Sequence, residues 1–342
     1  MLVGASDVPA RGKARMTPRK SGGYTVIGDA VVDHLYRTDR LPSESLPARG
    51  RFTSSVGGRG LNCAVAAARL GLPVRLIAAV GDDEAGRRIL AYLRREGVDT
   101  DLVKVVPGEP TPVDALIVTS SGSTGAIAHR DEAVRLREED ITTPAAREAI
   151  TSAAAVLITF EPPALVIEQA IRMVHATPHR PWLLVQPTPP IGMLSYFRRY
   201  LATIDFLVGT RAQLGTLVPG CAPSADFDAE IAPWLLGHGV RYVCAVEGLA
   251  CRVRFAGPAL DIPRPAAAVL AETPGARSAF LAALAHRLIR SGRPGRADFV
   301  FATAAMAASQ SFGELPDAMP VADRINRILA LPSDAEPTPE IV

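Results

Sequence analysis

The stretch VGGRGLNCAVAAARLG, from Val56 to Gly71, decides the fold that we expect for this chain of 342 residues. Its adjacent glycines, Gly57 and Gly58, let the backbone approach a small ligand closely, because glycine has no Cβ. The alanine-rich run that follows predicts a helix, which Gly71 ends. Asn62 lies in the first turn of that helix and offers both a hydrogen-bond donor and an acceptor. The stretch therefore predicts a glycine turn that leads into a helix beside a polar ligand.

Outside this stretch, predicted strands alternate with predicted helices. Strand-like runs rich in aliphatic residues occur at YTVIGDAVVD (24–33), VRLIAAVG (74–81), AAVLITF (154–160), PWLLVQP (181–187), IDFLVGT (204–210) and RYVCAVEG (241–248). Amphipathic segments such as DEAGRRILAYLRREG (83–97) and ALVIEQAIRMVHA (164–176) lie between them. Strands that alternate with helices predict an α/β protein with a mostly parallel central sheet covered on both faces.

The composition narrows the class of protein. Hydrophobic residues make up 48% of the chain, enough for a sizeable core, and no apolar run reaches the ~18 residues that cross a bilayer. The 37 basic and 35 acidic residues leave a net charge of +2, which would not recruit nucleic acid. The four cysteines and six histidines show no zinc-like spacing, which predicts no metal site. We expect a cytoplasmic protein without a nucleic-acid or membrane partner.

The two ends of the chain differ from its centre. Residues 1–22 are basic and lack the apolar core of a secretory signal, so we expect a disordered tail. Either Met1 or Met16 can be the biological start, since the first strand-like run begins at Tyr24. Residues 333–342 are acidic and proline-rich and predict a solvated tail. A single α/β domain over residues 23–332 remains.

Candidate binding residues follow the predicted strands, because ligands of open α/β sheets bind beyond the carboxyl ends of the strands. Asp33 ends the first predicted strand, and its carboxylate accepts hydrogen bonds from two hydroxyls while Asn62 satisfies a third. With Gly57 and Gly58, these residues predict a clamp for a polyol. A glycine turn with a helix-capping asparagine is the structural alternative, and Glu161 is expected to cap a helix start.

The quoted stretch, followed by AAVGDDEAGRRILAYLRREGVDT (78–100), resembles the ribokinase family of carbohydrate kinases, also called the phosphofructokinase-B family. PTPVDALIV (110–118) and AETPGARSAFLAALA (271–285) follow in the family's order, so that the resemblance covers about Tyr24 to Leu331. It implies a three-layer sandwich with a small β lid, formed by about residues 34–56 and 109–131. Carried over position by position, Asp33, Gly58 and Asn62 hold substrate hydroxyls, Arg59 replaces the family's lysine, and Leu61 replaces its alanine.

The nucleotide half departs from the family's pattern. The N-x-x-E motif that organises magnesium and phosphate aligns with TRAQ, which places Thr210 and Gln213 at its polar positions. Neither side chain supplies the negative charge that Mg²⁺ favours. The G-x-x-G turn on the adenine side aligns with EGLA, which begins at Glu247. The resemblance therefore assigns Thr210 and Glu247 to a nucleotide region without its usual side chains.

The carboxyl-terminal signature, D-T-x-G-A-G-D in the family, aligns with ETPGARS. Glu272, Gly275 and Ala276 keep the anion-binding turn, whereas Ser278 stands at the position of the catalytic aspartate. A serine hydroxyl cannot act as a carboxylate base near neutral pH, and we expect Ser278 to be a helix N-cap. Arg277 replaces a glycine; its guanidinium can fill the space of the transferring phosphoryl group, bind a phosphate on a ligand, or turn to solvent.

These departures favour a ribokinase-like protein that binds a sugar- or nucleoside-like ligand, which can carry a phosphate, without efficient kinase activity. Such a protein would be a pseudokinase or a fold recruited to another reaction. The alternative is an active, divergent carbohydrate or nucleoside kinase whose base lies outside the family motif. ATP and Mg²⁺ are expected only under this alternative. The resemblance also implies a possible homodimer formed through the lid.

Overall fold

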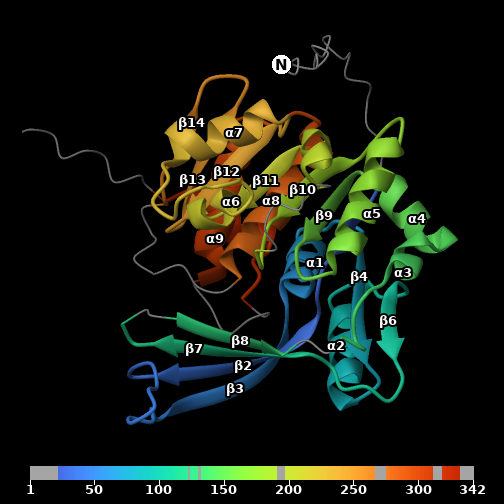
Figure 1. Ribbon diagram of the computed structural model, residues 1–342, viewed down its shortest axis with the longest axis vertical. Coiled ribbons are helices and arrows are strands. Elements are labelled where there is room, and N and C mark those ends of the chain that lie inside the picture. Colours follow the sequence, from blue (N-terminus) through green and yellow to red (C-terminus); the bar gives the residue numbers. More distant parts are fainter. Residues whose placement is uncertain are drawn as a thin grey trace, which may run out of the picture.

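Among the residues that the structure describes, a sheet of ten strands forms the centre of the molecule (Figure 1). The computed structural model describes residues 22–121, 124–129, 132–190, 197–265, 275–310 and 318–331. The predicted amino-terminal tail, apart from Gly22, and the predicted carboxyl-terminal tail lie outside these ranges. The strands run in the order β14 (Leu260–Ile262), β13 (Ala250–Phe255), β12 (Tyr242–Glu247), β11 (Phe206–Gly209), β10 (Trp182–Gln186), β9 (Ala155–Thr159), β1 (Tyr24–Ile27), β4 (Val74–Gly81), β5 (Val98–Asp99), and β6 (Val103–Val106) also pairs with β4.

The sheet is mostly parallel, as the alternation of strands and helices predicts. Pairing is parallel from β12 across to β5 and antiparallel only where β13 and β14 close one edge. The carboxyl ends of β1, β9, β10, β11 and β12 therefore lie along one edge of the sheet. Every loop that follows one of these strands begins at this edge, where ligands of open α/β sheets bind.

Helices cover both faces of the sheet because consecutive strand residues point to opposite sides. Val26 and Leu157 pack with one group of helices, whereas Ile27 and Ile158 pack with the other. The first group contains α1 (Arg59–Arg69), α2 (Glu84–Arg95), α8 (Ala276–Ser291), α9 (Arg296–Gln310) and α10 (Ala322–Leu329). The second contains α3 (Glu138–Thr142), α4 (Pro144–Thr151), α5 (Ala164–Ala176), η1 (Phe197–Thr203), α6 (Arg211–Gly215), η2 (Phe227–Ile231) and α7 (Ala232–Gly237).

A second, four-stranded sheet extends from the main body and forms the lid (Figure 1). Its order is β3 (Gly50–Gly57), β2 (Val31–Thr38), β7 (Val113–Thr119) and β8 (Thr124–His129). Strands β2 and β7 pair in parallel, and β3 and β8 flank them in antiparallel pairs. Burial decreases along β2, from the buried Val31 to exposed residues near Thr38. The root of the lid is therefore packed against the body, while its far end meets solvent.

The first strand-like run divides into two elements, which corrects the position expected for Asp33. β1 ends at Ile27 in the main sheet, and β2 begins at Val31 in the lid sheet. Gly28 has no room for a larger side chain, because a Cβ there would lie 2.6 Å from Thr159 Oγ1 and 2.8 Å from the Cα of Gly60. The chain thus leaves the main sheet where α1 and β9 approach it closely. Asp33 is the third residue of a lid strand rather than the end of the central strand.

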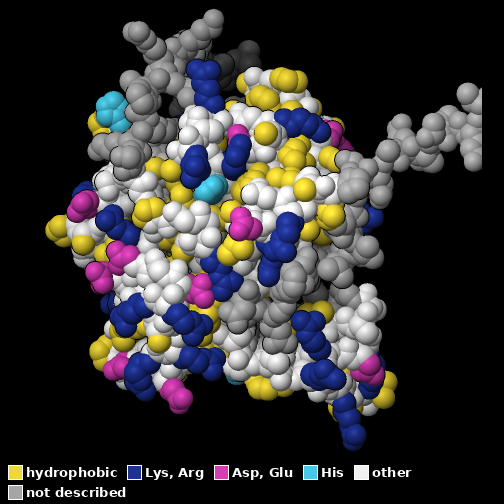
Figure 2. Space-filling view, turned by 180° about the vertical axis from the view of Figure 1, so that it is seen from behind, with side chains coloured by type: hydrophobic (Ala, Val, Ile, Leu, Met, Phe, Trp, Pro, Cys, Tyr) yellow, Lys and Arg dark blue, Asp and Glu magenta, His cyan; other side chains and the backbone are white. Residues whose placement is uncertain are grey.

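Charged side chains are dispersed over the face of the molecule shown in Figure 2, where Lys and Arg lie at many separate places with Asp and Glu among them. This distribution agrees with the nearly balanced composition of the chain. Within the described ranges, no helix has both the length and the apolar character needed to cross a membrane.

Candidate functional site

The lid and the body meet where β3 ends and α1 begins, and the backbone there has no room for side chains. A Cβ on Gly57 would lie 1.9 Å from Oδ2 of Asp33, so the Asp33 carboxylate packs directly against this glycine. Gly58 has a φ of 101°, a conformation that favours glycine, and forms the N-cap of α1. The structure therefore brings together Asp33, Gly57 and Gly58, which the sequence predicted as parts of one clamp.

The first turn of α1 packs on the loop between β1 and β2. Leu61 N donates a hydrogen bond of 2.9 Å to the carbonyl of Asp29, and Gly60 N lies 3.3 Å from Asp29 Oδ1. A Cβ on Gly60 would lie 2.6 Å from the same carbonyl oxygen, so a larger residue would separate the helix from the loop. This contact fixes the start of α1 relative to Asp29.

Asn62 lies in the fourth position of α1 and is 5% exposed. Its Oδ1 is buried and has no hydrogen-bond partner in the part of the chain that the structure describes. The N-cap of α1 is Gly58, and no side chain caps this helix, so the alternative of a helix-capping asparagine is wrong. An acceptor buried without a partner is unfavourable, so Asn62 Oδ1 has unused capacity to accept a hydrogen bond.

Glu161 contacts the first residue of α1, although the sequence predicted another role for it. Its Oε1 accepts a hydrogen bond from Arg59 Nη1 at 2.5 Å, and its side chain is 4% exposed. The N-cap of α5 is Pro163, so the expectation that Glu161 caps this helix is wrong. Its second oxygen, Oε2, is buried without a hydrogen-bond partner among the described residues. The sequence feature that could have indicated a binding role for Glu161 is its position two residues after β9, because ligands of open α/β sheets bind at that edge.

The electrostatics of this pair differ from those of a surface ion pair. Burial raises the pKa of Glu161 to about 7, the negative charge of Asp29 adds to the rise, and Arg59 opposes it. Burial alone would lower the pKa of Arg59. The carboxylates of Glu161, Asp29 and Asp114 have the larger, opposite effect, so the pKa of Arg59 is raised. The site thus holds a permanent cation next to a carboxyl group that titrates near neutrality.

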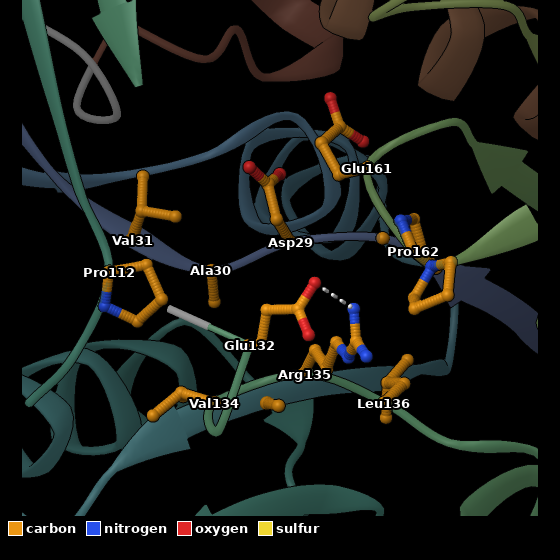
Figure 3. Close-up of a pocket in the computed structure, with 13 residues that line it drawn as sticks. Asp29, Ala30, Val31, Pro112, Glu132, Val134, Arg135, Leu136, Glu161 and Pro162 are labelled. Carbon is orange, nitrogen blue, oxygen red and sulfur yellow. Dashed lines mark ion pairs between the residues drawn. The ribbon is translucent and has the colours of Figure 1, made fainter. Parts of the chain in front are cut away.

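A cavity of about 240 Å³ lies beside the two carboxylates. Its lining residues are Gly28, Asp29, Ala30, Val31, Ala79, Pro112, Glu132, Val134, Arg135, Leu136, Glu161, Pro162 and Pro163. In Figure 3 the side chains of Asp29 and Glu161 point to the same side, away from Glu132 and Arg135. Glu132 and Arg135 form their own ion pair of 3.1 Å, drawn as the dashed line. The cavity therefore has both polar and apolar lining, with a paired charge on its opposite wall.

The start of α8 lies against α1 and differs from the sequence prediction in one respect. Gly275, with a φ of 90°, is the N-cap, so the expectation that Ser278 caps the helix is wrong. Ser278 is the third residue of α8, is buried, and its side chain hydrogen-bonds with Cys63 of α1. No side chain caps α8, and its first turn contains no acidic residue. Ala276 is buried and Arg277 is half-buried in that turn.

The other residues assigned to the nucleotide region follow neighbouring strands. Thr210 caps α6: its Oγ1 accepts from Gln213 N at 3.1 Å, while Gln213 Oε1 accepts from Thr210 N at 2.9 Å. Glu247 ends β12 and accepts a hydrogen bond of 2.6 Å from Arg211 N. Glu272 lies outside the described residues. Thr210, Gln213 and Glu247 therefore all hold the start of α6.

Curated proteins similar to this chain include two pentose kinases by name. A ribokinase of Schizosaccharomyces pombe is 30% identical over 182 residues, which is 50% of this chain and 56% of that protein. A deoxyribokinase of Salmonella typhi is 26% identical over 269 residues, 78% of this chain and 86% of that protein.

Solved structures share the fold at lower identity. Arabidopsis thaliana ribokinase, complexed with ribose and ATP, matches with a TM-score of 0.77 and 22% identity over 92% of this chain and all of that one. Giardia lamblia ribokinase matches with a TM-score of 0.79 and 18% identity over 91% and 99% of the two chains. These likenesses confirm the expected ribokinase-like fold. The sequence pattern of the pfkB family carbohydrate kinases matches residues 24–313, and the chain therefore belongs to this family.

Proposed function

We propose that this chain is a carbohydrate kinase that transfers the γ-phosphoryl group of ATP to a hydroxyl of a sugar. The observation that carries the proposal is a pair of buried acceptors, Asn62 Oδ1 and Glu161 Oε2, that lack hydrogen-bond partners among the described residues. An unsatisfied buried polar group destabilises a protein by about 1–3 kcal/mol. The neighbouring hydroxyls of a sugar would satisfy both oxygens.

The names of the relatives support transfer over simple binding. The curated proteins are named as a ribokinase and a deoxyribokinase, and the Arabidopsis structure holds ribose and ATP. These names and this complex favour the alternative of an active kinase over the expected pseudokinase. Pentoses are the first sugars to test on this basis.

The geometry suggests a role for each residue of the clamp. Asp33, pressed against Gly57, would accept from adjacent hydroxyls, because an ionised carboxylate has only acceptors. Asn62 would accept from a third hydroxyl, and Arg59 would hold Glu161 in place. The close glycine backbone leaves room for the sugar near Gly58. Binding would bury the sugar between the lid and α1.

The amino terminus of α8 fits the phosphate end of ATP. Its N-cap is a glycine without a side chain, and the first turn has no carboxylate to compete with an anion. The backbone N–H groups of such a turn and the helix dipole favour a phosphate group. Arg277 adds a cation in the same turn. These features support phosphate binding, from ATP or from a phosphorylated ligand.

The described side chains do not fit a protein-held magnesium ion. Thr210 and Gln213 use their side-chain oxygens to cap α6, and Glu247 accepts from a backbone N–H. In the described ranges, no group of three or more His, Cys, Asp or Glu side chains is arranged to hold a metal ion. No step of the proposed transfer therefore uses a metal ligand among the described residues.

A sugar-binding protein without transfer is the second candidate, because Ser278 stands where the family resemblance expects a catalytic carboxylate. Ser278 is 3% exposed and hydrogen-bonded to Cys63, which leaves it poorly placed to receive a proton. The two candidates share the clamp and differ only in phosphoryl transfer.

One assay separates them. ADP release from Mg·ATP is measured with and without D-ribose, 2-deoxy-D-ribose and a panel of nucleosides, together with ligand affinity by calorimetry. Release that depends on one of these acceptors supports the kinase. Binding without acceptor-dependent release supports the second candidate, and neither binding nor release would exclude both.

The phosphate proposal for Arg277 has its own test. Ribose 5-phosphate and D-ribose are compared by the shift in the thermal midpoint of the wild type and of Arg277→Met. Preferential stabilisation by the phosphate that disappears in the variant supports phosphate binding by Arg277. Equal shifts for the two ligands would contradict it.

A homodimer through the lid is also proposed. The described lid exposes large apolar side chains, including Tyr36 and Phe52, whose rings lie 5.1 Å apart, and Ile127, which is 68% exposed. Apolar residues exposed on a small sheet favour association with a second surface. Light scattering should give twice the chain mass for the wild type and the single mass for Phe52→Lys; a monomeric wild type contradicts the proposal.

A further inference from the structure

A carboxylate other than that of the family signature lies at the clamp. Glu161 follows β9 at the ligand-binding edge, its side chain is 4% exposed, and it comes from a segment far in sequence from α8. Arg59 binds Oε1, which fixes the orientation of the carboxylate, while Oε2 is buried without a partner in the described residues. This oxygen is the one available to accept a proton from a bound hydroxyl.

The usual source of a base in this fold is missing from the first turn of α8. That turn contains no acidic residue, and Ser278 is buried with its hydroxyl engaged by Cys63. α1 connects the two regions, because Arg59 and Cys63 lie one helical turn apart on it. Arg59 bonds to Glu161, and Cys63 hydrogen-bonds with Ser278 in the first turn of α8.

We propose that Glu161 is the general base of phosphoryl transfer, an inference that rests on the proposed kinase function. Glu161 Oε2 takes the proton of the substrate hydroxyl as the oxygen of that hydroxyl forms a bond to the γ-phosphorus of ATP. The bond between the γ-phosphorus and the β,γ-bridging oxygen breaks, and its electron pair leaves with ADP. The proton stays on Glu161 until it passes to solvent, so that charge and atoms balance.

The charged groups around Glu161 come from several elements. Arg59 and Cys63 face it from α1, Asp29 faces it from the loop after β1, and Asp114 of β7 acts on Arg59. The Glu132–Arg135 pair lines the opposite wall of the shared cavity. Burial and Asp29 hold the pKa of Glu161 at about 7, against the effect of Arg59.

This pKa suits a base that works near neutral pH. A glutamate with an ordinary pKa of about 4.3 is a weak proton acceptor, whereas one that titrates near the working pH combines basicity with a useful ionised fraction. Only ionised Glu161 accepts the proton. The transfer rate should therefore fall as the pH is lowered through about 7.

The test compares Glu161→Gln with a matched control, Glu168→Gln. Glu168 is also largely buried and paired with an arginine, Arg199, at 2.6 Å, but it lies on α5 and outside the residues that line the cavity. Steady-state transfer from ATP to the best acceptor of the panel is measured from pH 5.5 to 9, together with acceptor affinity by calorimetry. Glu161→Gln should lower kcat by about 100-fold or more, the usual range for loss of a general base.

Two readouts distinguish a base from a binding residue. If Glu161 is the base, kcat of the wild type and of Glu168→Gln should fall as the pH is lowered. The residual kcat of Glu161→Gln should be independent of pH over the measured range. If Glu161→Gln keeps its kcat and only KM rises, Glu161 merely binds the sugar and the inference is wrong while the kinase function stands. If the wild type transfers nothing, both proposals fail.

Glu161→Asp covers the case in which Glu161→Gln does not fold. The shorter side chain keeps a carboxylate but withdraws it from the hydroxyl, so kcat should fall at least tenfold and keep its decline in acid. An unchanged kcat in Glu161→Asp would overturn the inference.

Discussion

Arg59 and Glu161 form the contact that organises the site: Nη1 of Arg59 lies 2.5 Å from Oε1 of Glu161, although 102 residues separate them in the chain. The pair joins the start of α1 to the end of β9, and thus the glycine turn to the main sheet. Since burial would otherwise favour the neutral carboxyl, Arg59 keeps a fraction of Glu161 ionised near pH 7.

Replacing Arg59 with methionine should raise the pKa of Glu161 further above 7, because the opposing cation is lost. Transfer should then be weak at pH 7 and recover as the pH rises toward 9. Arg59→Lys retains the charge and should keep a pH profile close to that of the wild type. Kinetic pH profiles of both variants check the prediction, and identical profiles for Arg59→Met and Arg59→Lys would contradict it.

Glu161 should also make unfolding dependent on pH. Its folded pKa of about 7 exceeds the unfolded value of about 4.3, so the folded state binds more protons between these pH values. The associated stability is complete below about pH 4 and is lost as the pH rises through 7, with a total of about 2–4 kcal/mol. The free energy of unfolding in urea is measured for the wild type and for Glu161→Gln at several pH values. The difference between the two should decline as the pH rises, and a difference that does not vary with pH would contradict the prediction.

Replacing Asn62 with leucine should separate stability from binding. The free protein should keep or gain up to about 1 kcal/mol of stability, because a buried acceptor without a partner is removed. The affinity for D-ribose should fall at least tenfold by calorimetry, because a clamp acceptor is lost. Asn326→Leu, at an exposed position of α10, is the control and should leave affinity unchanged. Unaltered affinity in Asn62→Leu would remove Asn62 from the clamp.

Gly57→Ala should disrupt the clamp, because the new Cβ would lie 1.9 Å from Oδ2 of Asp33. The carboxylate must move, so we expect a loss of about 1–3 kcal/mol in stability and at least a tenfold loss of sugar affinity. Gly237→Ala in α7 has no atom within 4 Å of its Cβ and should leave affinity intact. Equal thermal midpoints and affinities for the two variants would show that Asp33 adapts.

Ser278→Ala should leave the transfer rate within about threefold of the wild type, because Ser278 bonds to Cys63 and the proposed base is Glu161. Stability should fall by about 1 kcal/mol through loss of this hydrogen bond. Cys63→Ala, which removes the other partner, is the matching variant for the stability measurement. A transfer rate lowered tenfold or more in Ser278→Ala, with the fold intact, would return Ser278 to the reaction.

Local patterns in the sequence predicted the fold. The alternation of strand-like and helical runs determines which residues face the two layers of helices, because side-chain direction repeats along each element. The Gly57–Gly58 turn, with Asn62 four residues later, was also predicted to lie beside Asp33, and the structure packs the Asp33 carboxylate against Gly57. Such features are encoded within a few residues, and they can be recognised without knowing the tertiary structure.

Only the tertiary structure decided how these pieces meet. YTVIGDAVVD looks like one strand, but tight packing of Gly28 against α1 and β9 directs its second half into the lid. Local preference equally suggests that Ser278 caps a helix, whereas Gly275 takes that position. The partnership of Glu161 with Arg59, and the pKa that follows from it, arises from burial and from a contact between residues far apart in the chain. Charge and desolvation at such a site depend on three-dimensional neighbours, which the pattern of nearby residues does not contain.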